Sequence, residues 1–126
     1  MRTNIIICTL FCMLFLSCED NEYYKGEYII INECDKPIDC YSVGRNAPSI
    51  GNEFEIHDYI SAKSTLTLRK INITDKAKVK DIFVYIEFYQ SGQKAIKNPM
   101  NQDFWIKTVS NSQLYYTLVV DSSFFK

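Results

Sequence analysis

The sequence has few of the residues on which most enzyme and metal sites depend. Its one histidine is His57, and it contains neither a Gly-x-Ser-x-Gly sequence nor a glycine-rich phosphate loop. A relay from His57 to Asp58 or Glu55 can be drawn, but no serine is singled out as its nucleophile, so we expect His57 to be solvated. The cysteine spacing fits no usual zinc pattern. We therefore expect no metal site, no cofactor and no catalytic residue.

The chain also lacks an excess of charge of either sign. It has 14 lysine and arginine residues and 15 aspartate and glutamate residues, which gives a net charge of −1. The densest basic segment is interrupted by Asp75 and lacks the interleaved aromatic residues of a single-strand binder. Its basic residues are Arg69, Lys70, Lys76, Lys78 and Lys80. We expect a solvated edge and turn there, and no nucleic-acid partner.

No apolar run is long enough to cross a bilayer as a helix. The longest covers residues 5–16, after one basic residue, Arg2, and before Ser17, Cys18 and an acidic segment. A bilayer core requires about 20 helical residues, whereas the apolar region of a signal peptide has about 7–15. Residues 1–17 are therefore predicted to be an N-terminal signal helix that is removed from the mature protein.

The end of this run, Phe15-Leu16-Ser17-Cys18, resembles a lipobox, the sequence recognised by the bacterial lipoprotein pathway. The resemblance implies that Cys18 carries a diacylglycerol and becomes the first residue of the mature chain, held on the membrane by its acyl chains. The acidic residues at 19–22 resemble the tract that directs many Bacteroidetes lipoproteins to the outer face of the outer membrane; the periplasmic face is the alternative. An ordinary secretory signal and an uncleaved anchor also stay open.

Two cysteines remain beyond Cys18, namely Cys34 and Cys40. An even number of cysteines in an exported protein suggests a disulfide. A chain reversal at residues 35–37 would bring the two sulfurs together across a hairpin. Two buried free thiols are the alternative.

Alternating apolar and polar residues predict short β-strands, and no long helical period follows Cys18. Candidate strands cover residues 27–33, 38–43, 54–60, 64–73, 80–90, 103–109 and 113–121, the second as hairpin partner of the first. A phase change in the fourth predicts a bulge near Lys70. The spacing predicts an all-β domain at residues 27–126, an immunoglobulin-like antiparallel β-sandwich of about 6–7 strands. The lipidated cysteine and an acidic tether would occupy residues 18–26.

Four segments of the chain resemble small, mostly uncharacterised β-sandwich lipoproteins of gut Bacteroidetes. They are IINECDKPI at residues 30–38, LTL at 66–68, VYIEF at 84–88 and YYTLVVD at 115–121. These motifs are patterns of strands and turns, not of chemistry. The resemblance therefore implies the fold and leaves the function open.

One face of the candidate strand at 80–90 is the best candidate for a binding surface. It carries Phe83, Tyr85, Glu87 and Tyr89, and a row of rings on a sheet can stack on sugar rings. Burial of this row under a loop is the alternative. Trp105 is expected in the core.

The anchor, the sandwich and the missing active site together favour a non-catalytic binding or interaction module, with a glycan or a protein as ligand. A protective or inhibitory lipoprotein of the immunity type is one alternative, and a structural component of the envelope is another.

Overall fold

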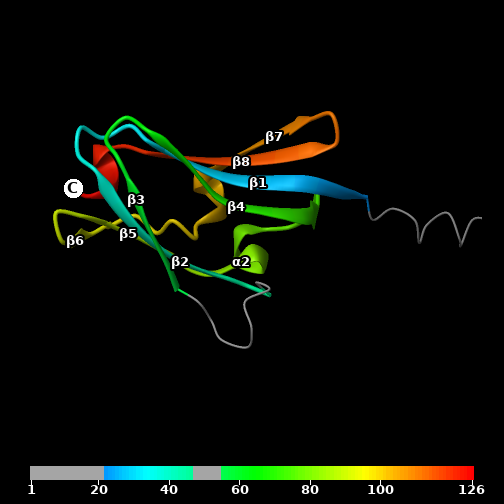
Figure 1. Ribbon diagram of the computed structural model, residues 1–126, viewed down its shortest axis with the longest axis horizontal. Helices are drawn as coiled ribbons and strands as arrows, with labels where there is room; N and C mark the ends of the chain where they lie inside the picture. The colour runs from blue at the N-terminus through cyan, green and yellow to red at the C-terminus, as the bar shows by residue number, and fades with distance from the viewer. Residues whose placement is uncertain (1–21, 47–54) are drawn as a thin grey trace, which may run out of the picture.

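Two four-stranded β-sheets make up the described part of the chain, residues 22–46 and 55–126, in a computed structural model. Sheet I has the order β4 (Thr65–Thr74), β1 (Tyr23–Asn32), β8 (Gln113–Val120) and β7 (Trp105–Ser110). Sheet II has the order β3 (Glu55–Ile60), β2 (Ile38–Gly44), β5 (Phe83–Gln90) and β6 (Gln93–Lys94). Figure 1 shows β1, β8 and β7 in the upper part of the view and β2, β5 and β6 below them. The predicted all-β sandwich is confirmed.

Neighbouring strands run antiparallel with one exception among the described pairs. Strand β8 lies parallel to β1, from Lys25 opposite Gln113 to Asn32 opposite Val120. The prediction of an antiparallel sandwich is therefore wrong for this pair. A parallel pair needs a connection longer than a hairpin, and here the connection is the whole of the chain between the first and the last strand.

The predicted hairpin of the first two strands is wrong as well. Strand β1 pairs with β4 and β8, whereas β2 pairs with β3 and β5, so residues 33–37 cross from one sheet to the other. The buried side chain of Asn32 holds this crossover. Its amide nitrogen donates to the carbonyl oxygens of Lys36, Ile60 and Ser61 at 3.0, 3.2 and 3.2 Å, and its oxygen accepts from the Cys34 N–H at 2.9 Å.

The crossover also explains the state of the two cysteines. Cys34 and Cys40 are free, buried thiols, and the Cys34 thiol lies 3.7 Å from the carbonyl oxygen of Val120 in sheet I. The candidate disulfide is absent from this structure because the hairpin that would have joined the two sulfurs does not form. Burial raises the pKa of the Cys40 thiol to about 12, so this thiol is protonated and unreactive at neutral pH.

Strand β1 begins at Tyr23, opposite Thr74, four residues earlier than predicted, so part of the expected tether belongs to sheet I. Gly26 permits this pairing. A Cβ atom at this position would lie 2.6 Å from Cδ1 of Ile73 and 2.9 Å from the carbonyl oxygen of Ile71. Glycine is thus the residue that lets β1 and β4 approach each other here.

Within residues 22–46 and 55–126, three short helices flank the strands. Helix α2 (Val79–Ile82) occupies the start of the segment predicted as a strand, and the Asp81 carboxylate accepts a hydrogen bond from the Lys78 N–H at 2.9 Å at the start of this helix. The other two are single turns, η1 (Gln102–Phe104) before β7 and η2 (Ser122–Phe124) after β8. None of the described helices is long and apolar enough to cross a membrane.

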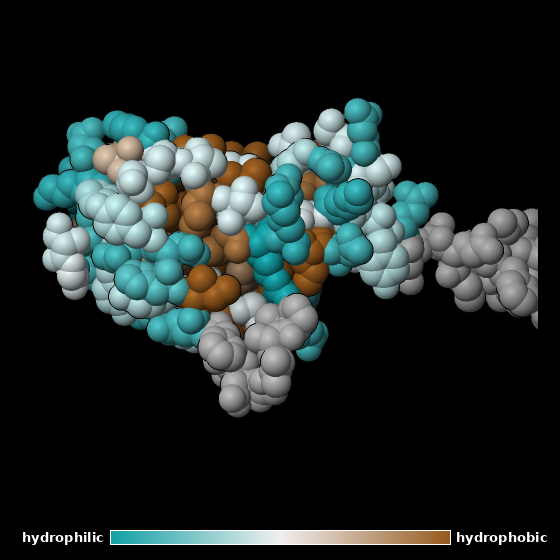
Figure 2. All heavy atoms as spheres, viewed as in Figure 1, coloured by the Kyte–Doolittle hydropathy of each residue, from teal (hydrophilic) through white to brown (hydrophobic). Residues whose placement is uncertain are grey.

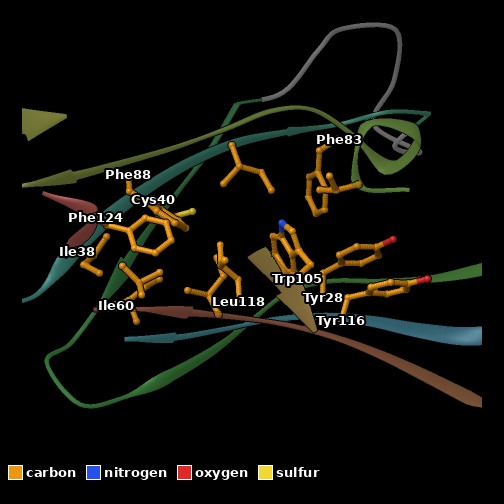
Figure 3. Packing of buried hydrophobic residues seen from close by; sticks show 14 of the residues in the cluster. Tyr28, Ile38, Cys40, Ile60, Phe83, Phe88, Trp105, Tyr116, Leu118 and Phe124 are labelled. Carbon is orange, nitrogen blue, oxygen red and sulfur yellow. The ribbon is translucent and has the colours of Figure 1, made fainter. Parts of the chain in front are cut away.

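The core lies between the two sheets. At one end the Tyr28 ring stacks on Tyr116 at 5.0 Å and meets Phe83 and Trp105 edge-on at 5.3 and 5.6 Å. Figure 3 shows these rings together and a second group around Phe88 and Cys40 at the other end of the core. Trp105 is buried, as predicted, and its indole N–H donates to the carbonyl oxygen of Pro99 at 2.7 Å. In Figure 2 hydrophobic residues gather in the middle of the view, with hydrophilic residues around them.

Candidate functional surface

The strands of sheet II have one set of side chains in the core and another set on a polar, aromatic outer surface. The inner side chains of β2 and β5, among them Ile38, Cys40, Ile86 and Phe88, are buried. The outer side chains include five rings and three carboxylates, which we call the aromatic-acidic face: Tyr41, His57, Tyr59, Tyr85, Tyr89, Asp39, Glu55 and Glu87.

The strand register decides which of these side chains are neighbours. Tyr59, Asp39 and Tyr89 form one row across β3, β2 and β5, and His57, Tyr41 and Glu87 form the next. In β2 and β5 each carboxylate therefore stands opposite a ring. We call this two-by-two arrangement the central block; it consists of Asp39, Tyr41, Glu87 and Tyr89.

Phe83 does not belong to this surface, and its prediction as part of the binding face is wrong. Its side chain is 1% exposed and packs on Tyr28 in the core. The cause is a bulge in β5: Val43 lies opposite Tyr85, but Gly44 lies opposite Phe83, so Val84 is an extra residue. Because a bulge shifts the alternation of side chains by one position, Phe83 points inward although Tyr85, Glu87 and Tyr89 point outward.

Three of the five rings of the face are in contact through Tyr41. The imidazole of His57 stacks on Tyr41 with centroids 4.3 Å apart and planes 7° from parallel. The Tyr89 ring meets Tyr41 at 5.6 Å and 89°, an edge-on contact. Tyr41 and Tyr89 thus form a right-angled corner. An open depression of about 370 Å³ lies at this corner, lined by Asp39, Tyr41, Glu55, Glu87, Tyr89 and Gly92.

Asp39 and Glu55 each have one side-chain partner, and Glu87 has two. Asp39 Oδ1 lies 2.8 Å from Nε2 of His57, and Glu55 Oε2 accepts from the Tyr85 hydroxyl. Glu87 accepts from the Tyr89 hydroxyl at 3.2 Å and lies 3.5 Å from Nζ of Lys94. Among the described residues, the second oxygens of Asp39 and Glu55 receive no hydrogen bond. The described part of the chain therefore leaves one oxygen of each of these two carboxylates without a donor.

The sequence predicted only those residues of this surface that lie on β5. Tyr41, Tyr59 and Asp39 come from β2 and β3, whose pairing with β5 the sequence did not predict. His57 is exposed, as expected, but it is also a member of the face.

Arg69 was expected to be solvated, yet it is half-buried. It donates to the carbonyl oxygens of Ile82 and Arg45 and lies 5.9 Å above the Phe83 ring, so it clamps β4 to the ends of β2 and α2.

Within residues 22–46 and 55–126, no three histidine, cysteine, aspartate or glutamate side chains gather closely enough to hold a metal ion. Cys18 lies outside the described residues.

Fold and surface together define a two-sheet β-sandwich with an aromatic and acidic face on the outside of one sheet. No protein-family model matches the chain, and comparison with curated proteins and with solved structures gives no match.

Proposed function

We propose that the chain is a lipid-anchored, non-catalytic binding module whose ligand contacts the aromatic-acidic face. The observation that carries this proposal is the placement of Tyr41, Tyr89, Asp39 and Glu87 in one block on the solvent side of sheet II. Tyrosine rings bury a large area at low cost in conformational entropy, which is why they are enriched at binding surfaces.

The position of the expected anchor supports this role. Residues 19–22 separate Cys18 from the first residue of β1, and four extended residues span at most about 14 Å. Figure 1 shows the start of β1 and the β5–β6 turn at opposite ends of the long axis, and Gly92 of that turn borders the depression. A domain held by Cys18 would therefore present this end of the face away from the lipid. We propose a site on the cell surface of a Bacteroidetes-type outer membrane, with its periplasmic face as the alternative.

The anchor is tested by the intact mass of the protein from native membranes. We expect acyl chains on Cys18, loss of the protein when whole cells are treated with protease, and neither lipid nor membrane retention in a Cys18→Ala variant. An unmodified Cys18 in the native protein would remove the anchor from the proposal.

The binding face is tested with the full-length protein in detergent on a panel of glycans and proteins. We expect at least one saturable ligand that a Tyr41→Ala, Tyr89→Ala double variant loses. A Tyr115→Ala variant is the matched control, because Tyr115 is a half-buried ring on the outer side of sheet I. Ligands that the double variant binds as well as the native protein would contradict the assignment of the face.

A further inference from the structure

We infer that the ligand is a protein that inserts an arginine side chain into the corner between Tyr41 and Tyr89. This inference rests on the proposed function and names the partner of that same face.

The central block has the geometry that a planar cation requires. Asp39 stands opposite Tyr89, and Tyr41 stands opposite Glu87, so the two carboxylates lie on one diagonal of the block and the two rings on the other. Cβ atoms of directly opposed residues are about 4.5–5.5 Å apart in an antiparallel pair. A group placed above the middle of the block is therefore within reach of both carboxylates and both rings.

The ring orientations disfavour a stacked sugar at the block. One face of Tyr41 is covered by His57 at 4.3 Å, and Tyr89 stands at 89° to Tyr41. A sugar ring needs a flat ring face to stack on, and these two tyrosines do not offer a common plane. A cation is attracted to each ring face separately, so a right-angled pair of rings accommodates it.

The charges of the depression are complementary to a guanidinium group. Asp39, Glu55 and Glu87 line it. Lys94 comes from the edge strand β6, its side chain is 60% exposed, and its Nζ lies 3.5 Å from Oε1 of Glu87. Arginine combines donors that match a carboxylate with a planar group that stacks on aromatic rings, which a lysine ammonium does not.

The shape of the surface indicates a protein as the source of the arginine. The depression is open rather than enclosed, and Tyr59, which is 64% exposed, stands beside Asp39 at its rim. A free amino acid or small organic cation would leave this rim uncovered, whereas an arginine presented by a protein surface brings apolar contacts for Tyr59. Buried arginine and tyrosine anchors are the side chains that dominate the affinity of protein interfaces.

The test is an NMR titration of the ¹⁵N-labelled full-length protein in a zwitterionic detergent. The probe is the capped peptide Gly-Arg-Gly, and the same peptides with citrulline and with lysine are the comparisons. We expect saturable shifts at residues 39–41 and 87–89 with a dissociation constant in the millimolar range for one anchor side chain. Citrulline keeps the shape and loses the charge, so its binding should be at least about tenfold weaker, with lysine in between.

Two substitutions, made singly and together, locate the binding. Asp39→Asn and Glu87→Gln should each lower the affinity for the arginine peptide several-fold, and the double variant should lower it at least about tenfold. Glu27→Gln is the matched control, because Glu27 is a carboxylate of β1 in sheet I that is paired with Lys70 at 3.6 Å. Thermal unfolding of each variant shows whether it is folded.

Failure of this inference differs from failure of the proposed function. Equal binding of citrulline, shifts outside the central block or no saturable shifts would overturn the arginine anchor. If the panel then yields a neutral glycan that the Tyr41, Tyr89 double variant loses, the binding face stands with another ligand. If neither the titration nor the panel finds a ligand on the face, both proposals fail.

Discussion

The middle parts of the outer faces of the two sheets are built from different residues, although both sheets cover the same core. The middle of the outer face of sheet I pairs Ile29 with Thr117, Ile31 with Val119 and Ile106 with Thr117. These β-branched residues are strong strand formers. The outer face of sheet II has rings and carboxylates at the corresponding positions of β2 and β5.

This difference shows which outer residues the sandwich requires for folding and which it does not. Sheet I shows that this sandwich forms a stable outer face from strand-forming residues. The three carboxylates of sheet II lie on its outer face and contribute nothing to the core. We therefore propose that a ligand accounts for the composition of the aromatic-acidic face, and the predictions below change residues of the face, of the core and of the crossover between the sheets.

The largest expected effect separates the face from the core within one strand. Phe83→Ala should lower the free energy of unfolding by about 3–5 kcal/mol, because it leaves a cavity beside Tyr28. Tyr89→Ala should lower it by less than about 1 kcal/mol, because its ring lies on the outer surface. Denaturant unfolding measures both. Similar losses in the two variants would show that Phe83 and Tyr89 lie in the same environment.

The next effect concerns the crossover that joins the two sheets. Asn32→Ala removes the partner of the Cys34 N–H and of three carbonyl oxygens in a buried site, so we expect a loss of about 2–3 kcal/mol. Asn72, which is exposed on β4, provides the control, since Asn72→Ala should change the stability by less than about 0.5 kcal/mol. An Asn32→Ala variant as stable as the control would mean that other contacts hold the sheets together.

The rings of the corner should contribute to binding and not to folding. Substitution of either Tyr41 or Tyr89 by alanine should lower the affinity for the arginine peptide about fivefold. This corresponds to the loss of about 1 kcal/mol expected for a cation–π contact. The NMR titration measures this loss, and Tyr115→Ala should leave the affinity unchanged. If neither substitution changes the affinity, only the carboxylates of the site contribute to binding.

The smallest effect is a gain. Lys94 lies 3.5 Å from Glu87 and competes with an incoming cation, so Lys94→Gln should raise the affinity for the arginine peptide about twofold. Lys107→Gln changes a lysine of sheet I, where Nζ donates to the carbonyl oxygen of Asp75, and should have no effect. Weaker binding in the Lys94 variant would show that this lysine takes part in the site.

Local patterns in the sequence predicted most of the strands and the link between the last two of them. Residues 110–112 were expected to link two strands, and there Asn111 and Ser112 have φ values of 45° and 65°, which suit a tight hairpin between β7 and β8. The alternation that predicted the strand at 113–121 coincides with the alternating burial of β8, because an inner face with period two is set by neighbouring residues alone.

Contacts between distant segments could not be predicted in this way. The parallel pairing of β1 with β8 depends on both ends of the chain, and the inward turn of Phe83 depends on a bulge opposite Gly44. The candidate site has the same limit, because Asp39 and Tyr41 join Glu87 and Tyr89 only through the β2–β5 register. The row on β5 was predicted in part, and its acidic neighbours were not.

The central claim, that the two outer faces differ because one of them binds a partner, can be tested directly by chemical labelling of tyrosines. The full-length protein is labelled on intact cells that produce it and, separately, after purification in detergent, and each tyrosine is quantified by mass spectrometry. We predict that labelling of Tyr59 and Tyr89 is several-fold lower on cells than in the purified protein, while labelling of Tyr115 is equal in the two samples. Equal labelling of all three tyrosines, or protection of Tyr115 instead, would contradict the assignment of the binding face to sheet II.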